Sequence, residues 1–469
     1  MSGVSLAERF PRLRDARGDA LAGLERAVER ARAYGERHVR PVALELDRRL
    51  AADPGAFPWE VVEQGLPYGL LSFAVPAEAG GDGGLSVRSS VIAEELCAAC
   101  PGVGNVFGAH ALGMAPLLLD GGARWIWLLR AIVEEQARGR PLLMAFAITE
   151  PDAGTDVEDP ELARRATFGT RAERAPGGWR LWGTKRFISN GSVARWVTVC
   201  MPTDPRRPAE TMTFFLVDAH ADGFEVSRVE HKMGQRACPA AELAFSGVFV
   251  PDEHVVGRVG DGLALTLMVL AASRPAVAAI ATGIARGAYE RVLDWLVAEA
   301  PDRLERQEVQ LALARMEEAI HVARQAYLDA ALEVDVAGPG GLLRHPAVRA
   351  LALLPRGVRE HPRTGAALRS RPARAATVRL LHGHVGDAAA TRALALASLA
   401  KAHASDAAAR VTTLALEVAG LEASVRPELE KLWRDARLTQ IYEGTNELNR
   451  VEVYRGLCRK ETLEVLPRP

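Results

Sequence analysis

A short polar segment near the C-terminal end holds the residues with the clearest chemical potential. Residues 440–447 spell Gln-Ile-Tyr-Glu-Gly-Thr-Asn-Glu, so Glu443 lies between Tyr442 and Gly444. A carboxyl group held against apolar walls has a raised pKa and can act as a base near neutral pH. Glycine lets a ligand approach the backbone closely. Glu443 is therefore a candidate catalytic base, although a single Glu beside a single Gly is more often a helix end.

Two further segments carry residues suited to a flat or anionic ligand. Residues 146–156 spell Phe-Ala-Ile-Thr-Glu-Pro-Asp-Ala-Gly-Thr-Asp, whose small residues expose backbone N–H groups and whose threonines offer hydroxyls. Residues 182–191 spell Trp-Gly-Thr-Lys-Arg-Phe-Ile-Ser-Asn-Gly, where Phe187 could wall a planar ring and Ser189 adds a hydroxyl. Taken singly, each segment is equally consistent with an ordinary turn or strand end.

An arginine precedes a long apolar stretch in the second half of the chain. Residues 272–275 spell Ala-Ser-Arg-Pro, and we expect Arg274 to open a helix there. The helix dipole disfavours a cation at a helix start, which indicates a specific anionic or polar partner. From these residues alone, an interdomain salt bridge explains Arg274 equally well.

The elements that position these groups follow from the residue pattern, which changes twice along the sequence. Residues from about 20 to 137 show helical spacing, short β-prone runs follow from about 142, and Ala/Leu-rich helical segments run from about 262 to 456. This order predicts a mainly α fold with a central β domain. The predicted units are an N-terminal helical domain at 1–138, an antiparallel β domain or barrel at 139–256 whose last strand ends at Val250, and a C-terminal helical bundle at 257–469.

Composition excludes several classes of protein. Lys plus Arg (58) nearly balances Asp plus Glu (59), and the net charge of −1 does not favour nucleic-acid binding. The five cysteines are odd in number and sparse, so Cys97 and Cys100 are expected to be buried small side chains in a reducing cytoplasm. The apolar stretch at 262–283 is expected to be a bundle helix and not a membrane span. We expect no metal site, since the pair His382 and His384 has no third ligand nearby.

An arginine-rich segment at about 337–390 interrupts the bundle. Glu360 is the only acidic residue between the first and last of its arginines, Arg344 and Arg379. A solvated surface insertion is the simpler interpretation, and a docking site for an acidic partner or for CoA phosphates is the alternative.

Together, six motifs in order resemble those of the acyl-CoA dehydrogenases, most closely the medium-chain type. They are Thr-Glu-Pro-x-Ala-Gly-Thr-Asp at 149–156, Gly-Thr-Lys-x-Phe-Ile-Ser-Asn-Gly at 183–191, Met-Gly-Gln-Arg at 233–236, Ser-Arg-Pro-x-Val-Ala at 273–278, Arg-Asp-Ala at 434–436 and Ile-Tyr-Glu-Gly-Thr-Asn-Glu at 441–447. The resemblance covers about residues 20–336 and 391–456. Several ordered motifs are far more specific than any one of them.

The resemblance implies FAD held between the three domains and assigns a role to each motif. Glu443 would remove the α-proton, and its backbone N–H would help to bind the thioester oxygen. Arg274, Tyr442 and Gly444 would meet the substrate. The residues expected at the cofactor are Phe146, Ile148, Thr149, Gly154, Thr155, Phe187, Ser189, Thr445 and Glu447.

The resemblance also implies a reaction and partners. The expected activity is the conversion of an acyl-CoA to a trans-2-enoyl-CoA, with FAD as hydride acceptor and an electron-transferring flavoprotein as partner. Some relatives carry the base just before the arginine of the Ser-Arg-Pro motif, but Ser273 occupies that place here, so Glu443 is the expected base. An acyl carrier protein thioester is an alternative substrate. An oxidase of the same fold, or a non-catalytic or nucleic-acid-associated relative, is an alternative function.

Two segments depart from the family pattern. Relatives carry an Arg-x-x-Phe-Gly segment and a Gln-x-x-Gly-Gly-x-Gly segment that reach a neighbouring subunit's FAD, whereas residues 298–305 and 416–422 match neither. This predicts a subunit of a heteromeric enzyme whose partner supplies the missing arm. The alternative is a homo-oligomer, dimer or tetramer, that substitutes Arg303 or the arginines of the 337–390 segment.

Overall fold

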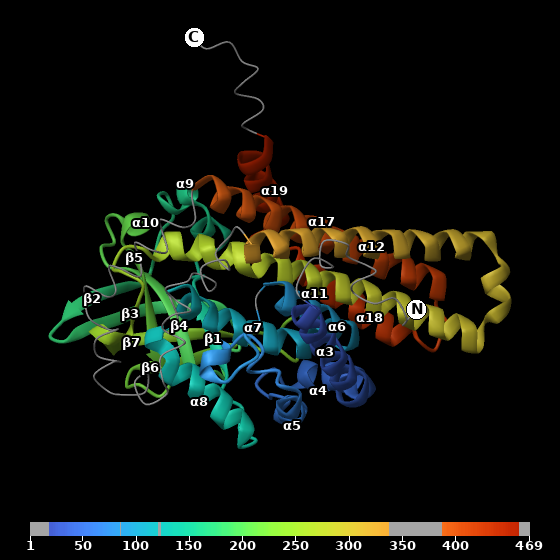
Figure 1. The fold of residues 1–469 in the computed structure, drawn as a ribbon, viewed down its shortest axis with the longest axis horizontal. Coiled ribbons are helices and arrows are strands. Elements are labelled where there is room, and N and C mark those ends of the chain that lie inside the picture. The colour runs from blue at the N-terminus through green and yellow to red at the C-terminus, as the bar shows by residue number, and fades with distance from the viewer. Residues whose placement is uncertain (1–17, 85, 121–122, 337–386, 459–469) are drawn as a thin grey trace, which may run out of the picture.

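The strands gather at one end of the molecule, beside the long helices of a C-terminal bundle (Figure 1). The computed structural model describes residues 18–84, 86–120, 123–336 and 387–458. The predicted mainly α fold with a central β domain is confirmed. The predicted domain boundaries at 138/139 and 256/257 stay predictions, and both fall between regular elements. Most of the arginine-rich 337–390 segment, with His382 and His384, lies outside the described residues.

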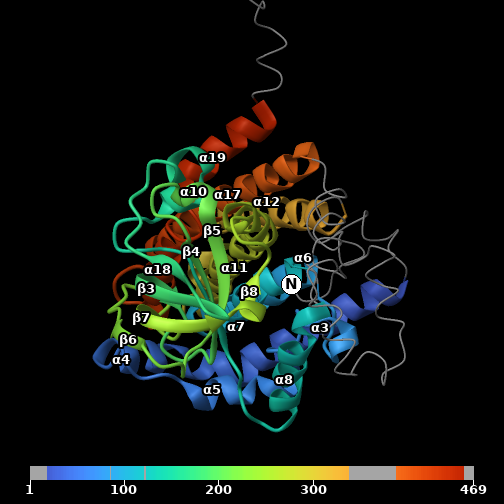
Figure 2. The ribbon, with the colours of Figure 1, turned by 90° about the vertical axis from the view of Figure 1, so that its left-hand side faces the viewer.

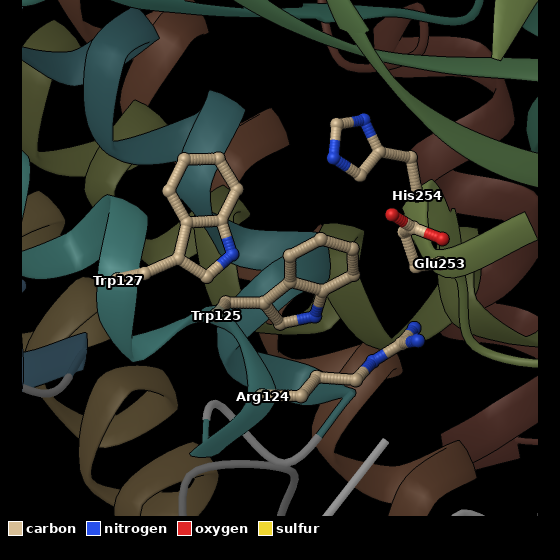
Figure 3. Close-up of a pocket in the computed structure, with 5 residues that line it drawn as sticks. All are labelled: Arg124, Trp125, Trp127, Glu253 and His254. Carbon is tan, nitrogen blue, oxygen red and sulfur yellow. The ribbon is translucent and has the colours of Figure 1, made fainter. Parts of the chain in front are cut away.

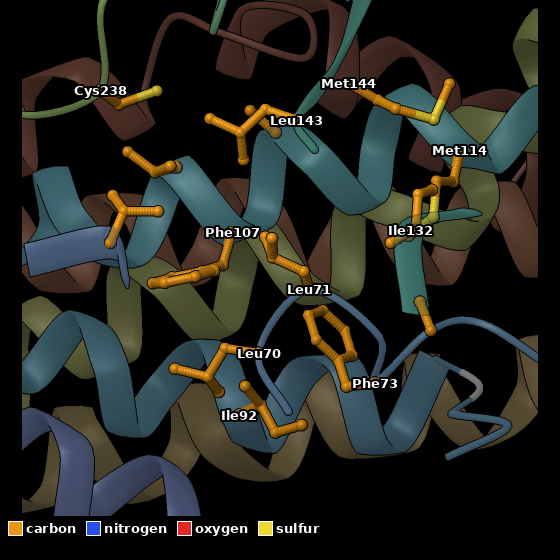
Figure 4. Close-up of a cluster of buried hydrophobic side chains, with 14 of the residues drawn as sticks. Leu70, Leu71, Phe73, Ile92, Phe107, Met114, Ile132, Leu143, Met144 and Cys238 are labelled. Carbon is orange, nitrogen blue, oxygen red and sulfur yellow. The ribbon is translucent and has the colours of Figure 1, made fainter. Parts of the chain in front are cut away.

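The N-terminal region is helical, as predicted. Its helices are α3 (Gly18–Tyr34), α4 (Ala43–Ala52), α5 (Trp59–Gln64), α6 (Ser86–Ala99), α7 (Pro101–Leu119) and α8 (Ile126–Ala137). Cys97 and Cys100 are free and buried, as expected. The apolar core of this region includes Phe73 and Phe107 and continues into the middle region through Leu143, Met144 and Cys238 (Figure 4). This continuous core packs the helices firmly against the strands.

The middle region contains two four-stranded sheets with the orders β1-β4-β5-β8 and β2-β3-β7-β6. The strands are β1 (Met144–Ala147), β2 (Arg171–Ala175), β3 (Gly178–Ser189), β4 (Trp196–Pro202), β5 (Met212–Asp218), β6 (Phe224–Val229), β7 (Ala240–Pro251) and β8 (Val255–Val256). Short helices α9 (Pro160–Ala163) and α10 (Pro208–Thr211) lie in the connections. In Figure 2 the molecule is turned so that the end with the strands faces the viewer.

Two details of the middle region differ from prediction. The pairing of β1 with β4 is parallel, so the sheets are not purely antiparallel. The strand that ends near Val250 is followed by the two-residue strand β8, which adds to β5. Parallel pairing requires a long crossover connection, and residues 148–195 supply one that carries the other sheet's β2 and β3.

The C-terminal bundle consists of α11 (Gly262–Glu299), α12 (Gln307–Val336), α17 (Asp387–Ala419), α18 (Arg426–Thr439) and α19 (Asn446–Val453). The prediction that Arg274 opens a helix is wrong, because α11 continues through Pro275. Pro275 has no N–H to donate to the Ala271 carbonyl, so one intrahelical hydrogen bond is lost within the packed bundle. Close by, Ser86 Oγ on α6 donates to the Ala272 carbonyl at 3.2 Å.

Helices α7 and α11 are each long and apolar enough to cross a membrane. In the fold, however, 67% of the apolar stretch of α7 and 61% of that of α11 are buried inside the protein. Their apolar character is therefore explained by their places in the core.

Helices α6 and α11 approach closely where α11 carries glycines. A Cβ at Gly283 would overlap the backbone carbonyl of Glu94, and one at Gly287 would overlap that of Ala98. Both contacts are to helix backbone, which cannot give way as a flexible side chain would.

We predict that Gly283→Ala destabilises the protein by about 2 kcal/mol, because the two helices must separate to admit the methyl group. Chemical denaturation would measure the loss. Gly55→Ala is the matched control, since its Cβ would meet only the Asp53 side chain at 3.4 Å. Equal stability of the two variants would contradict the close approach described here.

Candidate active site

Glu443 lies in the turn between α18 and α19, in an unusual backbone conformation. Its φ is +52°, and Gly444 follows with a φ of +81°. Left-handed backbone is unfavourable for a residue with a side chain and persists only where the surroundings hold it. The Asn449 side chain contributes, donating to the carbonyls of Gly444 (3.0 Å) and Thr445 (2.9 Å).

The Glu443 carboxyl group is half-buried and has one clear hydrogen-bond donor. Ser273 Oγ on α11 donates to Glu443 Oε2 at 2.7 Å. Burial raises the pKa of Glu443 above its usual value, while the Ser273 hydrogen bond and the positive charges of Arg274 and Lys401 oppose this shift. A raised pKa suits a group that accepts a proton near neutral pH.

Arg274 lies directly behind this turn and is completely buried, at 0% exposure. Its Nε donates to the Glu443 carbonyl oxygen at 3.1 Å. Its Nη1 donates to Ser398 Oγ on α17 at 2.8 Å and pairs with Glu452 on α19, while Nη2 lies 3.3 Å from Glu158 Oε2. These contacts are all to protein groups, so the structure gives Arg274 a role in holding the turn. Its predicted contact with substrate stays a prediction.

A second buried cation holds the turn from α17. Lys401 Nζ donates to the Gly444 carbonyl at 2.6 Å and to Asn446 Oδ1 at 3.0 Å. Burial, followed by the charge of Arg274, lowers the pKa of Lys401 to about 7. Sequence reasoning missed Lys401, Glu158 and Glu452, because charged residues at helical spacing usually mark a solvated face. Only the need of a buried Arg274 for acidic partners could have drawn attention to them.

The other residues predicted for the substrate and cofactor meet at the same turn. Tyr442 precedes Glu443, and its hydroxyl lies 3.3 Å from Gln235 Nε2 in the Met-Gly-Gln-Arg motif. Thr445 is the N-cap of α19, and its side chain accepts from the Leu448 N–H at 3.4 Å. Glu447 is exposed. Thr445 thus has a structural task in addition to the predicted one.

The two segments predicted to hold FAD lie side by side in the β domain. The Arg186 N–H donates to the Thr149 carbonyl at 2.9 Å, and Thr149 Oγ1 donates back to the Arg186 carbonyl. Phe187 follows in a β-bulge of β3, with a φ of +59° and 58% exposure. A bulge re-aims a side chain, and here it presents an aromatic ring outward.

The remaining predicted cofactor residues differ in exposure. Ile148 is buried, whereas Phe146, Thr149, Gly154, Thr155 and Ser189 are half-buried. Phe146 packs on Phe214 with ring centroids 5.5 Å apart. A Cβ at Gly154 would meet nothing within 4 Å, so space is open beside that backbone. The 146–156 segment leads directly into the short 3-10 helix Thr155–Glu158, whose Glu158 reaches Arg274.

Gly104 of α7 lies in a tight helix contact. A Cβ there would lie 2.5 Å from Cys97 Sγ, so this glycine serves the packing of α7 against α6. A separate surface pocket is lined by Arg124, Trp125, Trp127, Glu253 and His254 (Figure 3). None of the predicted site residues lines it. Within the described residues, no cluster of His, Cys, Asp and Glu is arranged to hold a metal ion.

Comparison with known proteins identifies the family. Models of the acyl-CoA dehydrogenase N-terminal, middle and C-terminal domains match residues 24–124, 145–248, and 260–351 with 360–458. The chain belongs to the acyl-CoA dehydrogenase family. It is therefore an oxidoreductase of that type, and membership implies FAD as cofactor. The exposed Phe187, the open space at Gly154 and the hydroxyls of Thr155 and Ser189 fit a flavin lying across these segments.

Individual relatives span nearly the whole chain. Cyclohex-1-ene-1-carbonyl-CoA dehydrogenase of Syntrophus aciditrophicus is 31% identical over 458 residues, covering 97% of this chain and 95% of that protein. Butyryl-CoA dehydrogenase from Megasphaera elsdenii has a similar structure, with a TM-score of 0.70 and 25% identity over 93% of this chain and 98% of that chain. A chain from a study of the electron transferring flavoprotein of Acidaminococcus fermentans gives a TM-score of 0.73 and 25% identity, with the same coverage.

Gly444 cannot be replaced without disturbing the turn. A Cβ there would lie 2.8 Å from Glu158 Oε2 and 3.1 Å from Arg274 Nη2. We predict that Gly444→Ala lowers the free energy of unfolding by about 2 kcal/mol, from left-handed strain and from displaced charges. Thermal unfolding would show the loss. The control is Gly420→Ala, which shares the left-handed backbone with a φ of +80° but whose Cβ would meet nothing within 4 Å; equal losses in both variants would argue against a tightly held turn.

Proposed function

We propose that this chain dehydrogenates an acyl-CoA between Cα and Cβ, with Glu443 as the α-proton base. The observation that carries the proposal is the setting of the Glu443 carboxyl group, which is half-buried, oriented by Ser273 and shifted toward a higher pKa. The turn that holds it is linked through Arg274 and Glu158 to the segment proposed to line the flavin. The base and the redox site are thus built as one unit.

Each part of the reaction has a proposed place. Glu443 takes the α-proton as the Cα–H bond breaks, the Cα–Cβ double bond forms, and the β-hydrogen leaves with two electrons. Bound FAD supplies the acceptor for that hydride. Among the described residues no acceptor pairs with the Glu443 backbone N–H, which leaves this donor free for the thioester oxygen. Donors aimed at developing negative charge are a major source of rate enhancement.

The proposed physiological oxidant is an electron-transferring flavoprotein. Support comes from the similarity to a chain studied with the electron transferring flavoprotein of Acidaminococcus fermentans. The acyl group proposed first is a compact or cyclic one, because the relative with 31% identity acts on cyclohex-1-ene-1-carbonyl-CoA. A panel with butyryl-CoA, octanoyl-CoA and cyclohex-1-ene-1-carbonyl-CoA would rank acyl chains, and an acyl carrier protein thioester would test the alternative carrier.

We predict that replacing Glu443 by Gln lowers the rate of flavin reduction by about 10³-fold while FAD content stays the same, because the variant lacks a base. Anaerobic mixing with the acyl-CoA panel would measure bleaching of the flavin. Glu308→Gln, an exposed change on α12, is the control and should retain wild-type rates. Rapid bleaching by the Glu443 variant would remove this residue from the mechanism. No bleaching of the wild-type flavin by any acyl-CoA would overturn the function, and fast reoxidation by oxygen would favour an oxidase.

We further propose that the enzyme is heteromeric. The sequence offered Arg303 as a substitute for the missing arm, but this side chain donates to the carbonyls of Ala419 (3.2 Å) and Val418 at the end of α17. It also lies over the Trp295 ring at 5.3 Å. The Arg303 guanidinium is thus engaged with the last carbonyls of α17, which argues against its use as a substitute for the missing arm. At the same end of the bundle, Leu421 is 79% exposed, which supports a protein partner covering it.

The chain expressed alone should therefore retain FAD at well below one equivalent, because part of each cofactor site is absent. Co-expression with a related acyl-CoA dehydrogenase subunit from the same genome should restore full content. Absorbance of released flavin per chain would give the ratio. Full FAD content in a homo-oligomer of this chain would refute the heteromeric arrangement and leave the proposed reaction intact.

A further inference from the structure

Glu158 is a second buried carboxyl group beside the base, and the sequence motifs gave it no role. It ends the 3-10 helix Thr155–Glu158 and is 5% exposed. Its Oε2 lies 3.3 Å from Arg274 Nη2 and 2.8 Å from the position that a Cβ on Gly444 would occupy. Glu158 therefore adjoins the base-bearing turn through space and contacts it through Arg274.

The charges around Glu158 come from every element packed on it. They are Arg274 on α11, Lys401 on α17, Glu443 in the turn and Glu452 on α19. On its own segment, Asp159 caps α9 by accepting from the N–H groups of Glu161 and Leu162 and pairs with Arg455. Three carboxyl groups, Glu158, Glu443 and Glu452, thus share two cations. One negative charge remains unbalanced when all are ionised, and such an excess is costly in a buried site.

We propose that Glu158 is a positioning residue for α-proton removal: it holds Arg274 behind the turn and supplies a second negative charge close to Glu443. The inference rests on the proposed function of Glu443. Glu452 also pairs with Arg274, but through Nη1 and together with Ser398. Glu452 is the matched control, because it pairs with Nη1, whereas Glu158 pairs with Nη2, the nitrogen nearest Gly444.

The titration of Glu158 agrees with this geometry. Burial raises its pKa to about 7, the charges of Glu443 and Glu452 add to the shift, and Arg274 and Lys401 oppose it. Coupling between two titrating groups is reciprocal, so ionisation of Glu158 makes the neighbouring Glu443 a stronger base. Above neutral pH, the second charge should therefore accelerate proton removal.

The test is the pH profile of flavin reduction in the FAD-loaded enzyme, between pH 5.5 and 9, with whichever of butyryl-CoA and cyclohex-1-ene-1-carbonyl-CoA is faster. Wild type should gain rate in a step near pH 7. In Glu158→Gln, which keeps an oxygen acceptor for Arg274, that step should vanish and the rate at pH 8 should fall about fivefold. Glu158→Asp should restore a step, and Glu452→Gln should keep the step at a lower pH.

A second readout does not depend on activity. A carboxyl group whose folded pKa is raised stabilises the fold fully below its unfolded pKa and loses this contribution as pH rises through about 7. The melting temperature of wild type relative to Glu158→Gln should therefore fall between pH 5 and pH 8. A constant difference would show that Glu158 does not titrate in this range.

The outcomes separate the two proposals. If wild type reduces its flavin and Glu158→Gln shows the same pH profile and rate, the role of Glu158 is refuted and that of Glu443 stands. The role of Glu158 is also refuted if the Glu158 and Glu452 variants both lose the step. The step would then depend on any acidic partner of Arg274 and not on Glu158 in particular. If wild type fails to reduce its flavin with every acyl-CoA, the proposed function itself fails. In that case the melting experiment still reports whether Glu158 titrates near neutral pH.

Discussion

The buried guanidinium of Arg274 is the interaction on which the arrangement of the site depends. A charge without exposure to water requires nearly ideal pairing, and removal of one partner of such a pair costs about 3–5 kcal/mol. Its partners come from segments far apart in sequence, namely Glu158, Ser398, Glu452 and the Glu443 carbonyl. The turn, the segment proposed to line the flavin and two bundle helices must therefore all be in place together.

Few of the described residues other than glycine have a left-handed backbone, and Glu443 is one of them. The only non-glycine residues with positive φ among those described are Phe187, Asn190, Gln235 and Glu443. Buried contacts hold them: Asn190 Nδ2 donates to the Val106 carbonyl at 2.8 Å, and the Gln235 N–H donates to Asp435. Left-handed backbone costs about 1–2 kcal/mol per residue. Such a conformation persists where the surrounding packing and hydrogen bonds hold it.

Candidate residues that are consecutive in the chain could be predicted from the sequence, whereas groups that only the fold brings together could not. The segment proposed to carry the base (440–447) and those proposed to line the flavin could be predicted as candidates because their chemistry lies in consecutive residues. The order of helices and strands followed from periodicity. The parallel pairing of β1 with β4 could not be found, since pairing of distant strands leaves little local signal. The prediction for Arg274 was wrong because Pro275 normally marks a helix start, whereas α11 continues through it inside the packed bundle. The buried acids Glu158 and Glu452 resemble surface residues until their distant partner is known.

Helix α11 contacts all three regions of the molecule along its 38 residues. Gly262 abuts Met212 of the β region, and Arg274 holds the turn that carries Glu443. Gly283 meets α6, and Arg291 pairs with Glu428 of α18 at 2.8 Å. A helix advances about 1.5 Å and turns about 100° per residue. One inserted or deleted residue within it would swing every later contact off its partner at once. We therefore expect α11 to tolerate changes of side chain better than changes of length, and insertions or deletions to be tolerated only in the connections outside it.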